Sequence, residues 1–315
     1  MEALRFEPIY QERVWGGQAM AQAFDRSLPS GCRVGESWEV VDRPEAQSVV
    51  RGGRHAGRTL REIIAGNAAE VMGPRWDPAR PFPLLVKWLD CRERLSLQVH
   101  PPAEKAAALG GEPKTENWFI AAAAPGAAVI VGLRAGVTRA GFEEAAGAGT
   151  IEQCVNRLPL APGDSILVRS GTVHAIDAGN LILEVQQNSD TTYRVYDWGR
   201  VGLDGKPRQL HWREALESIR WDAPEARPVR AGPGTAVLVD CPEFRVRRIP
   251  VGPGQQLEFA AGQKTRLLHV VRGAGEETVT GQPWRRGENL LLPFGGRFAF
   301  RAHEDSQLLV TENFT

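Results

Sequence analysis

The segment Leu95–His100 (LSLQVH) combines the pattern of a strand with two side chains that can coordinate a metal ion. Side chains alternate between the two faces of a strand, so Gln98 and His100 share one face while the apolar residues share the other. The two prolines after His100 predict the end of the strand. The segment therefore holds an amide and an imidazole two residues apart on a rigid element.

Two further candidates lie downstream. His174 follows the turn at Gly171, and Glu116 lies in Lys114–Phe119 (KTENWF). Imidazole, carboxylate and carbonyl groups are plausible donors to Zn²⁺, and a catalytic zinc site keeps one position open for water or substrate. Glutamine is an uncommon zinc ligand, so its chemistry alone does not select Gln98. A lone histidine is more often a structural residue. We keep that interpretation for the remaining histidines, which are His55, His211, His269 and His303.

The elements that must position these groups are mainly strands, because 34 glycines and 22 prolines separate many short apolar runs. We expect strands at Pro83–Trp88, Arg94–His100, Ala128–Leu133, Ser165–Arg169, Leu181–Gln186, Thr192–Asp197, Thr235–Asp240, Phe244–Ile249, Leu267–Arg272, Asn289–Leu292 and Phe298–Arg301. The few expected helices are Leu60–Met72, Ala103–Leu109, Arg139–Ala146, Ile151–Arg157 and Trp212–Ile219.

The length of 315 residues is enough for about two domains. The segment Asp222–Gly234 (DAPEARPVRAGPG) is rich in proline and glycine and reads as a boundary. We therefore predict one domain over residues 1–228, which contains the candidate ligands, and a second over residues 229–315.

The charge balance argues against nucleic-acid and membrane-surface partners. The chain has 38 basic and 38 acidic residues and no long Lys/Arg block, so we expect a small-molecule partner. The N-terminus has no apolar signal core and no run of 18 apolar residues occurs, which predicts a cytoplasmic protein. Four scattered cysteines without CxxC spacing are expected to be reduced and structural, and they are Cys32, Cys91, Cys154 and Cys241.

A similar phrase occurs on both sides of the predicted boundary. Gly163–His174 and Gly287–Phe298 share the spacing G-x5-[P/R]-x-G-x2-[H/F], which fits a strand, a glycine turn and a second strand. The phrase resembles the second sequence motif of the cupin superfamily, whose terminal histidine ligates a metal. The resemblance implies two cupin β-barrels of jelly-roll type. A phenyl ring cannot coordinate metal, so we expect the second barrel to be metal-free.

Several phrases also resemble, in order, the short bacterial form of class I mannose-6-phosphate isomerase. They are Pro8–Gly17 (PIYQERVWGG), Gly35–Pro44 (GESWEVVDRP), Pro83–Pro102 (PLLVKWLDCRERLSLQVHPP), Lys114–Phe119, Pro162–Ile176 (PGDSILVRSGTVHAI) and Glu184–Arg200 (EVQQNSDTTYRVYDWGR). The chain departs from the family pattern at Asn117, Phe119 and Arg169, none of which is a ligand position.

The resemblance implies one Zn²⁺ per chain and a set of catalytic cations. The family's ligands fall on Gln98, His100, Glu116 and His174. Its active-site lysines and arginine fall on Lys87, Lys114 and Arg194. Lys87 could instead be an edge residue whose stem is covered while its ammonium reaches solvent, and Lys114 and Arg194 could form surface ion pairs. Trp15 and Trp118 are candidates for lining a sugar site.

The function implied is a zinc-dependent aldose–ketose isomerase that interconverts mannose 6-phosphate and fructose 6-phosphate through an enediol or enediolate. Two alternatives stay open: an isomerase of unphosphorylated mannose, and a metal-bound sugar sensor, since the cupin fold alone implies no function. The residues do not identify the proton-transfer base, nor do they choose between a monomer and a homodimer.

Overall fold

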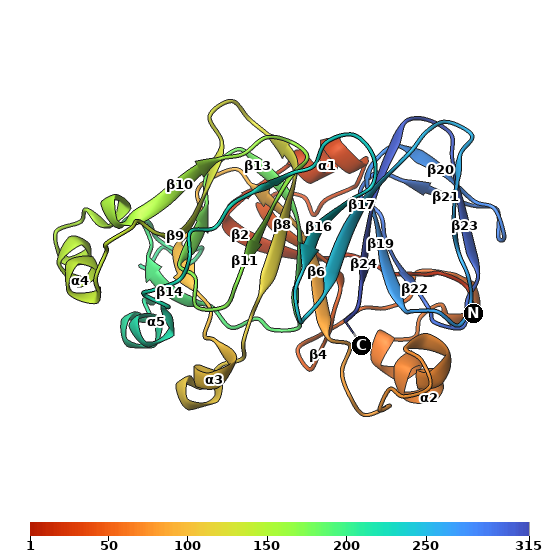
Figure 1. The fold of residues 1–315 in the computed structure, drawn as a ribbon, viewed down its shortest axis with the longest axis horizontal. Helices are drawn as coiled ribbons and strands as arrows, with labels where there is room; N and C mark the ends of the chain where they lie inside the picture. Colours follow the sequence, from red (N-terminus) through yellow and green to blue (C-terminus); the bar gives the residue numbers. More distant parts are fainter. Residues whose placement is uncertain (315) are drawn as a thin grey trace.

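The computed structural model describes residues 1–314, and two β-barrels lie side by side in it (Figure 1). The first barrel pairs a seven-stranded with a five-stranded sheet. In spatial order the seven strands are β15 (Val229–Arg230), β11 (Asp164–Val168), β8 (Glu116–Ala123), β13 (Asn180–Gln187), β6 (Leu84–Cys91), β3 (Val34–Val40) and β2 (Ile9–Gly17). The five strands are β10 (Val155–Pro159), β9 (Ala128–Leu133), β12 (His174–Ile176), β7 (Leu97–Val99) and β14 (Tyr193–Tyr196).

The second barrel pairs a six-stranded with a four-stranded sheet. The six strands are β1 (Leu4–Arg5), β22 (Asn289–Leu292), β19 (Arg266–Arg272), β24 (Ser306–Glu312), β17 (Arg245–Val251) and β16 (Ala236–Asp240). The four are β18 (Gln256–Phe259), β23 (Phe298–Ala302), β20 (Ala274–Glu277) and β21 (Gln282–Arg285). A small hairpin, β4 (Asp42–Arg43) and β5 (Ala46–Gln47), lies apart from both barrels' sheets.

The helices are short, and they flank the barrels (Figure 1). They are α1 (Ala19–Phe24), α2 (Leu60–Val71), α3 (Ala103–Ala106), α4 (Arg139–Gly147) and α5 (Trp212–Ser218), with 3₁₀ turns at Gly53–His55, Ala107–Leu109 and Ile151–Cys154. The prediction of a mainly β fold with few short helices is confirmed. No helix within residues 1–314 has the length and apolar character needed to span a bilayer.

The two copies of the repeated phrase have the same place in their barrels. In the first copy β11 belongs to the seven-stranded sheet and β12 to the five-stranded sheet facing it. In the second copy β22 belongs to the six-stranded sheet and β23 to the four-stranded sheet. His174 and Phe298 each begin the second strand of their copy. The repeat read from the sequence is therefore a structural repeat.

The barrels share an apolar core where the seven-stranded and six-stranded sheets meet. Trp88 from the first barrel and Leu267 from the second are fully buried in one hydrophobic cluster. The Trp88 Nε1–H also donates a hydrogen bond of 3.0 Å to the carbonyl oxygen of Gly287. Two short strands cross the boundary expected after residue 228, because β1 pairs with β22 and β15 pairs with β11. The domain limits themselves stay a prediction.

Two local expectations were incomplete because long-range contacts decide them. The expected helix Ile151–Arg157 ends as a 3₁₀ turn at Cys154, and Val155 begins β10, which pairs with β9. Helix α1 was not expected from the sequence, since it has only six residues. Its first backbone N–H, at Ala19, donates to a carboxylate oxygen of Asp90 at 2.5 Å, a capping partner far away in the chain.

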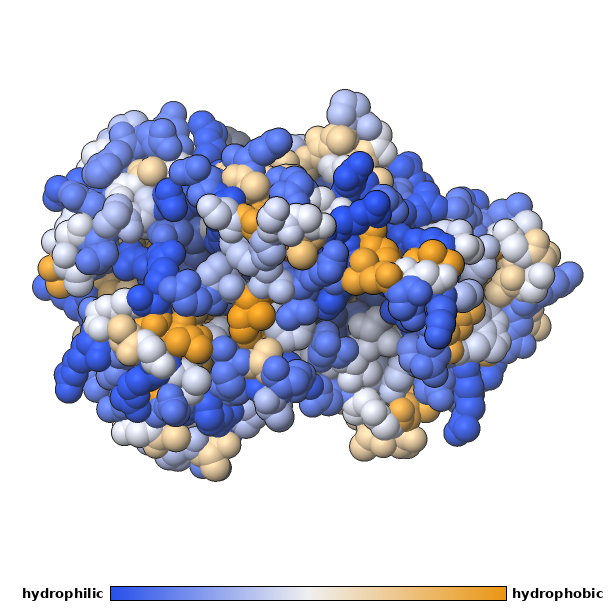
Figure 2. Space-filling model, turned by 180° about the vertical axis from the view of Figure 1, so that it is seen from behind, coloured by the Kyte–Doolittle hydropathy of each residue, from blue (hydrophilic) through white to orange (hydrophobic). Residues whose placement is uncertain are grey.

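The face opposite that of Figure 1 is predominantly hydrophilic, with hydrophobic residues in several separate patches (Figure 2). All four cysteines are free, as expected, and Cys91 and Cys154 are buried. The interior of the first barrel contains many buried polar residues, and several of them lie close together.

Candidate metal centre and active site

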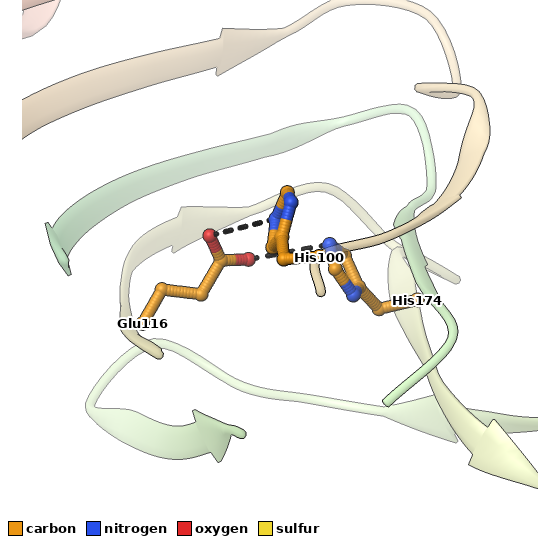
Figure 3. Close-up of side chains that lie close together, drawn as sticks. All are labelled: His100, Glu116 and His174. Atoms are coloured by element: carbon orange, nitrogen blue, oxygen red, sulfur yellow. Dashed lines mark ion pairs between the residues drawn. The ribbon is translucent and has the colours of Figure 1, made fainter. Parts of the chain in front are cut away.

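Three of the predicted ligands come together inside the first barrel (Figure 3). Nitrogen or oxygen atoms of His100, Glu116 and His174 all lie within 4.8 Å of one another. His100 Nε2 is 3.3 Å from Glu116 Oε2, and His174 Nε2 is 3.4 Å from Glu116 Oε1. His100 directly follows β7, His174 begins β12, and Glu116 begins β8 in the facing sheet. The barrel thus brings residues of both its sheets to one point.

Strand register and one glycine turn determine this convergence. His174 on β12 is the backbone partner of Gln98 on β7, so the two side chains share the inner face of the five-stranded sheet. The backbone N–H of Gly171 donates to the carbonyl oxygen of His100 at 2.7 Å. Gly171 has φ +87°, and a Cβ there would lie 2.7 Å from Arg220 Cγ. Glycine is required at this turn, which ties the His174 strand to His100.

The coordinating atoms of the cluster lack hydrogen-bond partners, although Glu116 Oε2 forms an ion pair with Lys114. Among the described residues, neither ring nitrogen of His100, neither carboxylate oxygen of Glu116 and not His174 Nε2 has a hydrogen-bond partner. His174 Nδ1–H donates to the carbonyl oxygen of Thr172 at 2.8 Å, which leaves the lone pair on Nε2. Each unsatisfied buried polar group costs about 1–3 kcal/mol. The donor set therefore fits a bound cation.

Protonation states also suit ligation. Burial, together with the Lys114 charge, lowers the pKa of His100 to about 3. Burial likewise lowers the pKa of His174. Burial alone would raise the pKa of Glu116, but the Lys114 ammonium holds it well below its usual range. Near neutral pH the cluster thus offers two neutral imidazoles and one carboxylate.

Gln98, Lys114 and Arg194 line one cavity of about 620 Å³, together with Trp15 and Trp118. Gln98 lies between His174 and Arg194 in backbone register, so all three side chains share one face. Lys114 Nζ is 3.0 Å from Glu116 Oε2. Burial opposes the charge on Lys114, but the charges of Glu116 and Glu184 outweigh it and raise the Lys114 pKa.

Lys87 reaches the same cavity by a route that differs from the expected one. The expected strands Pro83–Trp88 and Arg94–His100 follow one another in the sequence and were expected to be neighbours, but β6 pairs with β3 and β13, whereas β7 belongs to the facing sheet. Lys87 Nζ lies 3.6 Å from Glu36 Oε2 and 3.8 Å from Glu184 Oε2. It also lies 3.9 Å from Asp190 and 5.0 Å from the centroid of the Trp38 ring. Lys87 is thus buried among carboxylates and is not a surface residue.

Two further carboxylates line the cavity: Glu36 was not singled out from the sequence, whereas Glu184, like Asp197, was expected either to orient Arg194 or to be a plain surface carboxylate. Burial would raise the pKa of Glu36, but Lys87 and Arg13 lower it to about 2. Glu184 accepts a hydrogen bond of 2.9 Å from Trp118 Nε1, yet burial and the charge of Glu116 raise the Glu184 pKa to about 7. The signal for Glu36 was the alternation in GESWEV, where Glu36 shares a strand face with Trp38.

Arg194 on β14 is the cavity cation without a carboxylate ion pair among the described residues. Its Nη1–H donates to the carbonyl oxygen of Gln209 at 2.7 Å, and its Nε is buried without a partner. Asp197, which could have oriented Arg194, instead pairs with Arg200 and Arg208. The Arg194 guanidinium is therefore held in place while part of it stays available to a ligand.

Two β-barrels, one of them holding buried, unpartnered donors beside a charged cavity, define a cupin-type enzyme with a candidate metal centre. Residues 3–144 match the family described as phosphomannose isomerase type I, catalytic domain. The chain is 36% identical to mannose-6-phosphate isomerase ManA of Bacillus subtilis over 96% of this chain and 97% of that protein. It therefore belongs to the type I phosphomannose isomerase family, and it is an isomerase.

One solved structure supports this assignment, and a second shares the fold. The crystal structure of the mannose 6-phosphate isomerase from Bacillus subtilis matches with a TM-score of 0.87 and 30% identity, over 99% of each chain. A more distant fold relative, at 16% identity and a TM-score of 0.75 over 100% of each chain, is described as mannose 6-phosphate isomerase bound with zinc and yttrium.

Proposed function

We propose that this protein is a zinc-dependent isomerase that interconverts mannose 6-phosphate and fructose 6-phosphate, with one Zn²⁺ per chain. The observation that carries the proposal is the set of buried, unpartnered donors of His100, Glu116 and His174 beside a cavity lined by cations. The relatives described as mannose-6-phosphate isomerases supply the substrate class. The four free cysteines favour a reducing compartment, and we place the protein in the cytoplasm on that ground.

Gln98, His100, Glu116 and His174 are the proposed ligands. The last three present atoms without protein partners, and Gln98 shares their side of the five-stranded sheet through its register with His174. Three neutral ligands and one carboxylate would leave the bound Zn²⁺ with a net charge near +1. When bound, the metal supplies a positive charge that stabilises negative charge developing on the sugar oxygens. Loss of one preorganised group of this kind typically costs about 3–4 kcal/mol in the barrier.

The protein's own cations and carboxylates would handle the proton that moves between C1 and C2 through the enediol or enediolate. Lys114 is charged and buried beside Glu116, so it can hold or donate a proton next to the reacting oxygens. Glu36, with a pKa of about 2, is too weak a base. Two other groups of the cavity are close enough to take part. Glu184 has a pKa raised to about 7, and Lys87 Nζ lies 3.8 Å from Glu184 Oε2. In this scheme Lys114 is the proton donor, and Glu184 and Lys87 are the candidates for the base.

The test is an isomerase assay on protein of known metal content, with mannose 6-phosphate and free mannose as separate substrates. We expect turnover of the phosphorylated sugar, its loss on chelation and its return with zinc. Turnover of free mannose at equal kcat/KM would favour the isomerase of unphosphorylated mannose. Binding of sugar without turnover of either substrate would favour a sensor and refute the proposal.

A further inference from the structure

The chain that follows β14 forms a hairpin that borders the cavity. We call residues 198–210 the β14 hairpin. The hairpin is closed by a bridge between Val201 and Pro207 and by the hydrogen bond from Gly202 N to Lys206 O, at 2.7 Å. Four of its residues line the cavity: Gly202, Leu203, Asp204 and Arg208. Arg208 is the hairpin's cationic contribution to the cavity wall.

Two arginines of this region share one carboxylate. Arg200 uses all three of its donor nitrogens, two toward Asp197 Oδ1 and Nη1 toward the carbonyl oxygen of Arg94. Arg208 contacts both oxygens of Asp197, with Nε at 2.7 Å from Oδ2 and Nη2 close to Oδ1. These two bonds orient the Arg208 guanidinium and leave its Nη1 for another acceptor.

Arg194 adds a second guanidinium to the same wall. Its Nη1 is held by Gln209 of the hairpin, and its Nε is buried without a partner. Burial and the nearby charge of Arg208 lower the Arg194 pKa, and the charge of Asp197 offsets this only in part. Among the described residues Asp197 is thus the one carboxylate that forms ion pairs within this group of three arginines, and its partners are Arg200 and Arg208.

The rest of the cavity is better balanced. Lys114 faces Glu116, and Lys87 faces Glu36 and Glu184. The remaining hairpin carboxylate is Asp204, an exposed residue whose Oδ1 accepts the Lys206 backbone N–H at 3.0 Å. The surplus of positive charge therefore lies at the hairpin side. The phosphate on C6 of a hexose is at the far end of the sugar from C1 and C2, so its binding groups must lie away from the reacting centre.

We propose that Arg208 binds the phosphate of the sugar together with Arg194, and that the β14 hairpin thereby selects phosphorylated over free mannose. This inference rests on the proposed isomerase function and adds a specificity-determining residue to it. Two guanidiniums with free donors match the geometry and the double charge of a phosphate monoester. Free mannose offers no group for Arg208, so its turnover does not depend on this residue.

The test compares Arg208→Gln with Lys206→Gln, which removes the same charge from an exposed hairpin position that does not line the cavity. Inorganic phosphate serves as a competitive probe. We expect Arg208→Gln to raise the inhibition constant of phosphate and the KM for mannose 6-phosphate roughly 10- to 100-fold, as for a lost charged hydrogen bond. Its kcat/KM for free mannose and its zinc content should match the parent. Lys206→Gln should behave as the parent in every assay.

A second variant tests the same part of the cavity wall without changing the ion pair between Arg208 and Asp197. Asp204→Asn keeps an acceptor for the Lys206 N–H but removes a negative charge from the cavity wall, and it should lower the phosphate inhibition constant roughly 2- to 5-fold at low salt. A parent enzyme without activity on mannose 6-phosphate would refute the proposed function itself. An active parent whose phosphate inhibition is unchanged in Asp204→Asn and in folded Arg208→Gln would overturn only the assignment of the phosphate site. An equal loss of kcat/KM for free and phosphorylated mannose in Arg208→Gln would also overturn the assignment of the phosphate site.

Discussion

The two barrels use the same strand, turn and strand for opposite purposes. In the first barrel His174 begins β12 and meets Glu116 and His100 in a buried polar cluster. In the second barrel Phe298 begins β23 and packs in an apolar cluster with Leu292 and Phe300. The interior of the first barrel contains coordinating atoms without hydrogen-bond partners, whereas the interior of the second is filled by packed apolar side chains. The architecture is shared, and the set of side chains in the interior, of which His174 and Phe298 are one pair of counterparts, distinguishes the two barrels.

Burial of a histidine does not by itself mark a metal site. His269 in the second barrel is as buried as His174 in the first. Its Nδ1 lies 2.7 Å from Asn289 Oδ1 and its Nε2 lies 2.9 Å from Thr311 Oγ1, so both ring nitrogens have partners. His100 has none among the described residues. Unsatisfied donors, and not burial, distinguish the candidate ligands from the structural histidine.

The largest expected effect separates the barrels by metal content. His174→Ala should lose most of its zinc and at least about 100-fold of its activity, because it removes one of the few donors of the site. Phe298→Ala should keep about one zinc per chain while losing roughly 3–5 kcal/mol of unfolding free energy to the cavity it creates. Metal analysis and denaturant unfolding measure both. A full zinc content in folded His174→Ala would contradict the assignment of the metal site to the first barrel.

The next effect isolates the chemical step in the first barrel. Lys114→Met should retain zinc but lower kcat by roughly 10²–10⁴-fold, the range typical of general acid–base groups. Lys264→Met provides the matched control, since Lys264 is an exposed residue of the second barrel bonded to Asn313. Steady-state kinetics and incorporation of solvent deuterium at C2 of the sugar report the loss. An unchanged kcat in Lys114→Met would remove Lys114 from the mechanism.

A reciprocal substitution sharpens the comparison further. Phe298→His restores the motif histidine to the second barrel, but Phe298 packs there in a cluster of hydrophobic residues. We expect no second zinc and a loss of roughly 1–3 kcal/mol of unfolding free energy from an unsatisfied buried imidazole. Two zinc ions per chain in this variant would show that one histidine suffices, contrary to the role given to the full donor set.

The smallest effect concerns acid stability. The folded-state pKa of Glu36 is lowered from 4.5 to about 2. A carboxyl with a depressed pKa contributes stability that is present above the unfolded pKa and is lost as the pH falls toward the folded pKa. The stability difference between the parent and Glu36→Gln should therefore shrink by up to about 1.4 kcal/mol per pH unit between pH 4.5 and 2.

Urea unfolding at several pH values measures this difference. Glu12→Gln is the control, because Glu12 lies on the same cavity but is exposed. A constant difference between parent and Glu36→Gln across the acid range would contradict the buried ion pairing of Glu36 with Arg13 and Lys87.

Local patterns were sufficient for much of the fold. Ala128–Leu133 and Asn289–Leu292 are strands with the predicted limits, since each is an apolar run between turn residues. The repeated phrase was readable because its glycines and its terminal His or Phe recur at fixed spacing. The short helix α1 was not readable, because Asp90 caps it across the fold.

The sequence by itself determined which residues could ligate a metal, because alternation in a strand places Gln98 and His100 on one face and a family resemblance adds Glu116 and His174. Only the tertiary structure decided which charged side chains form ion pairs. It put Lys87 among carboxylates from other strands, and it paired Asp197 with Arg208 instead of Arg194. The physical reason is that spacing along one strand is a local property, whereas an ion pair between strands depends on sheet order, register and loop path, which no single segment of the chain encodes.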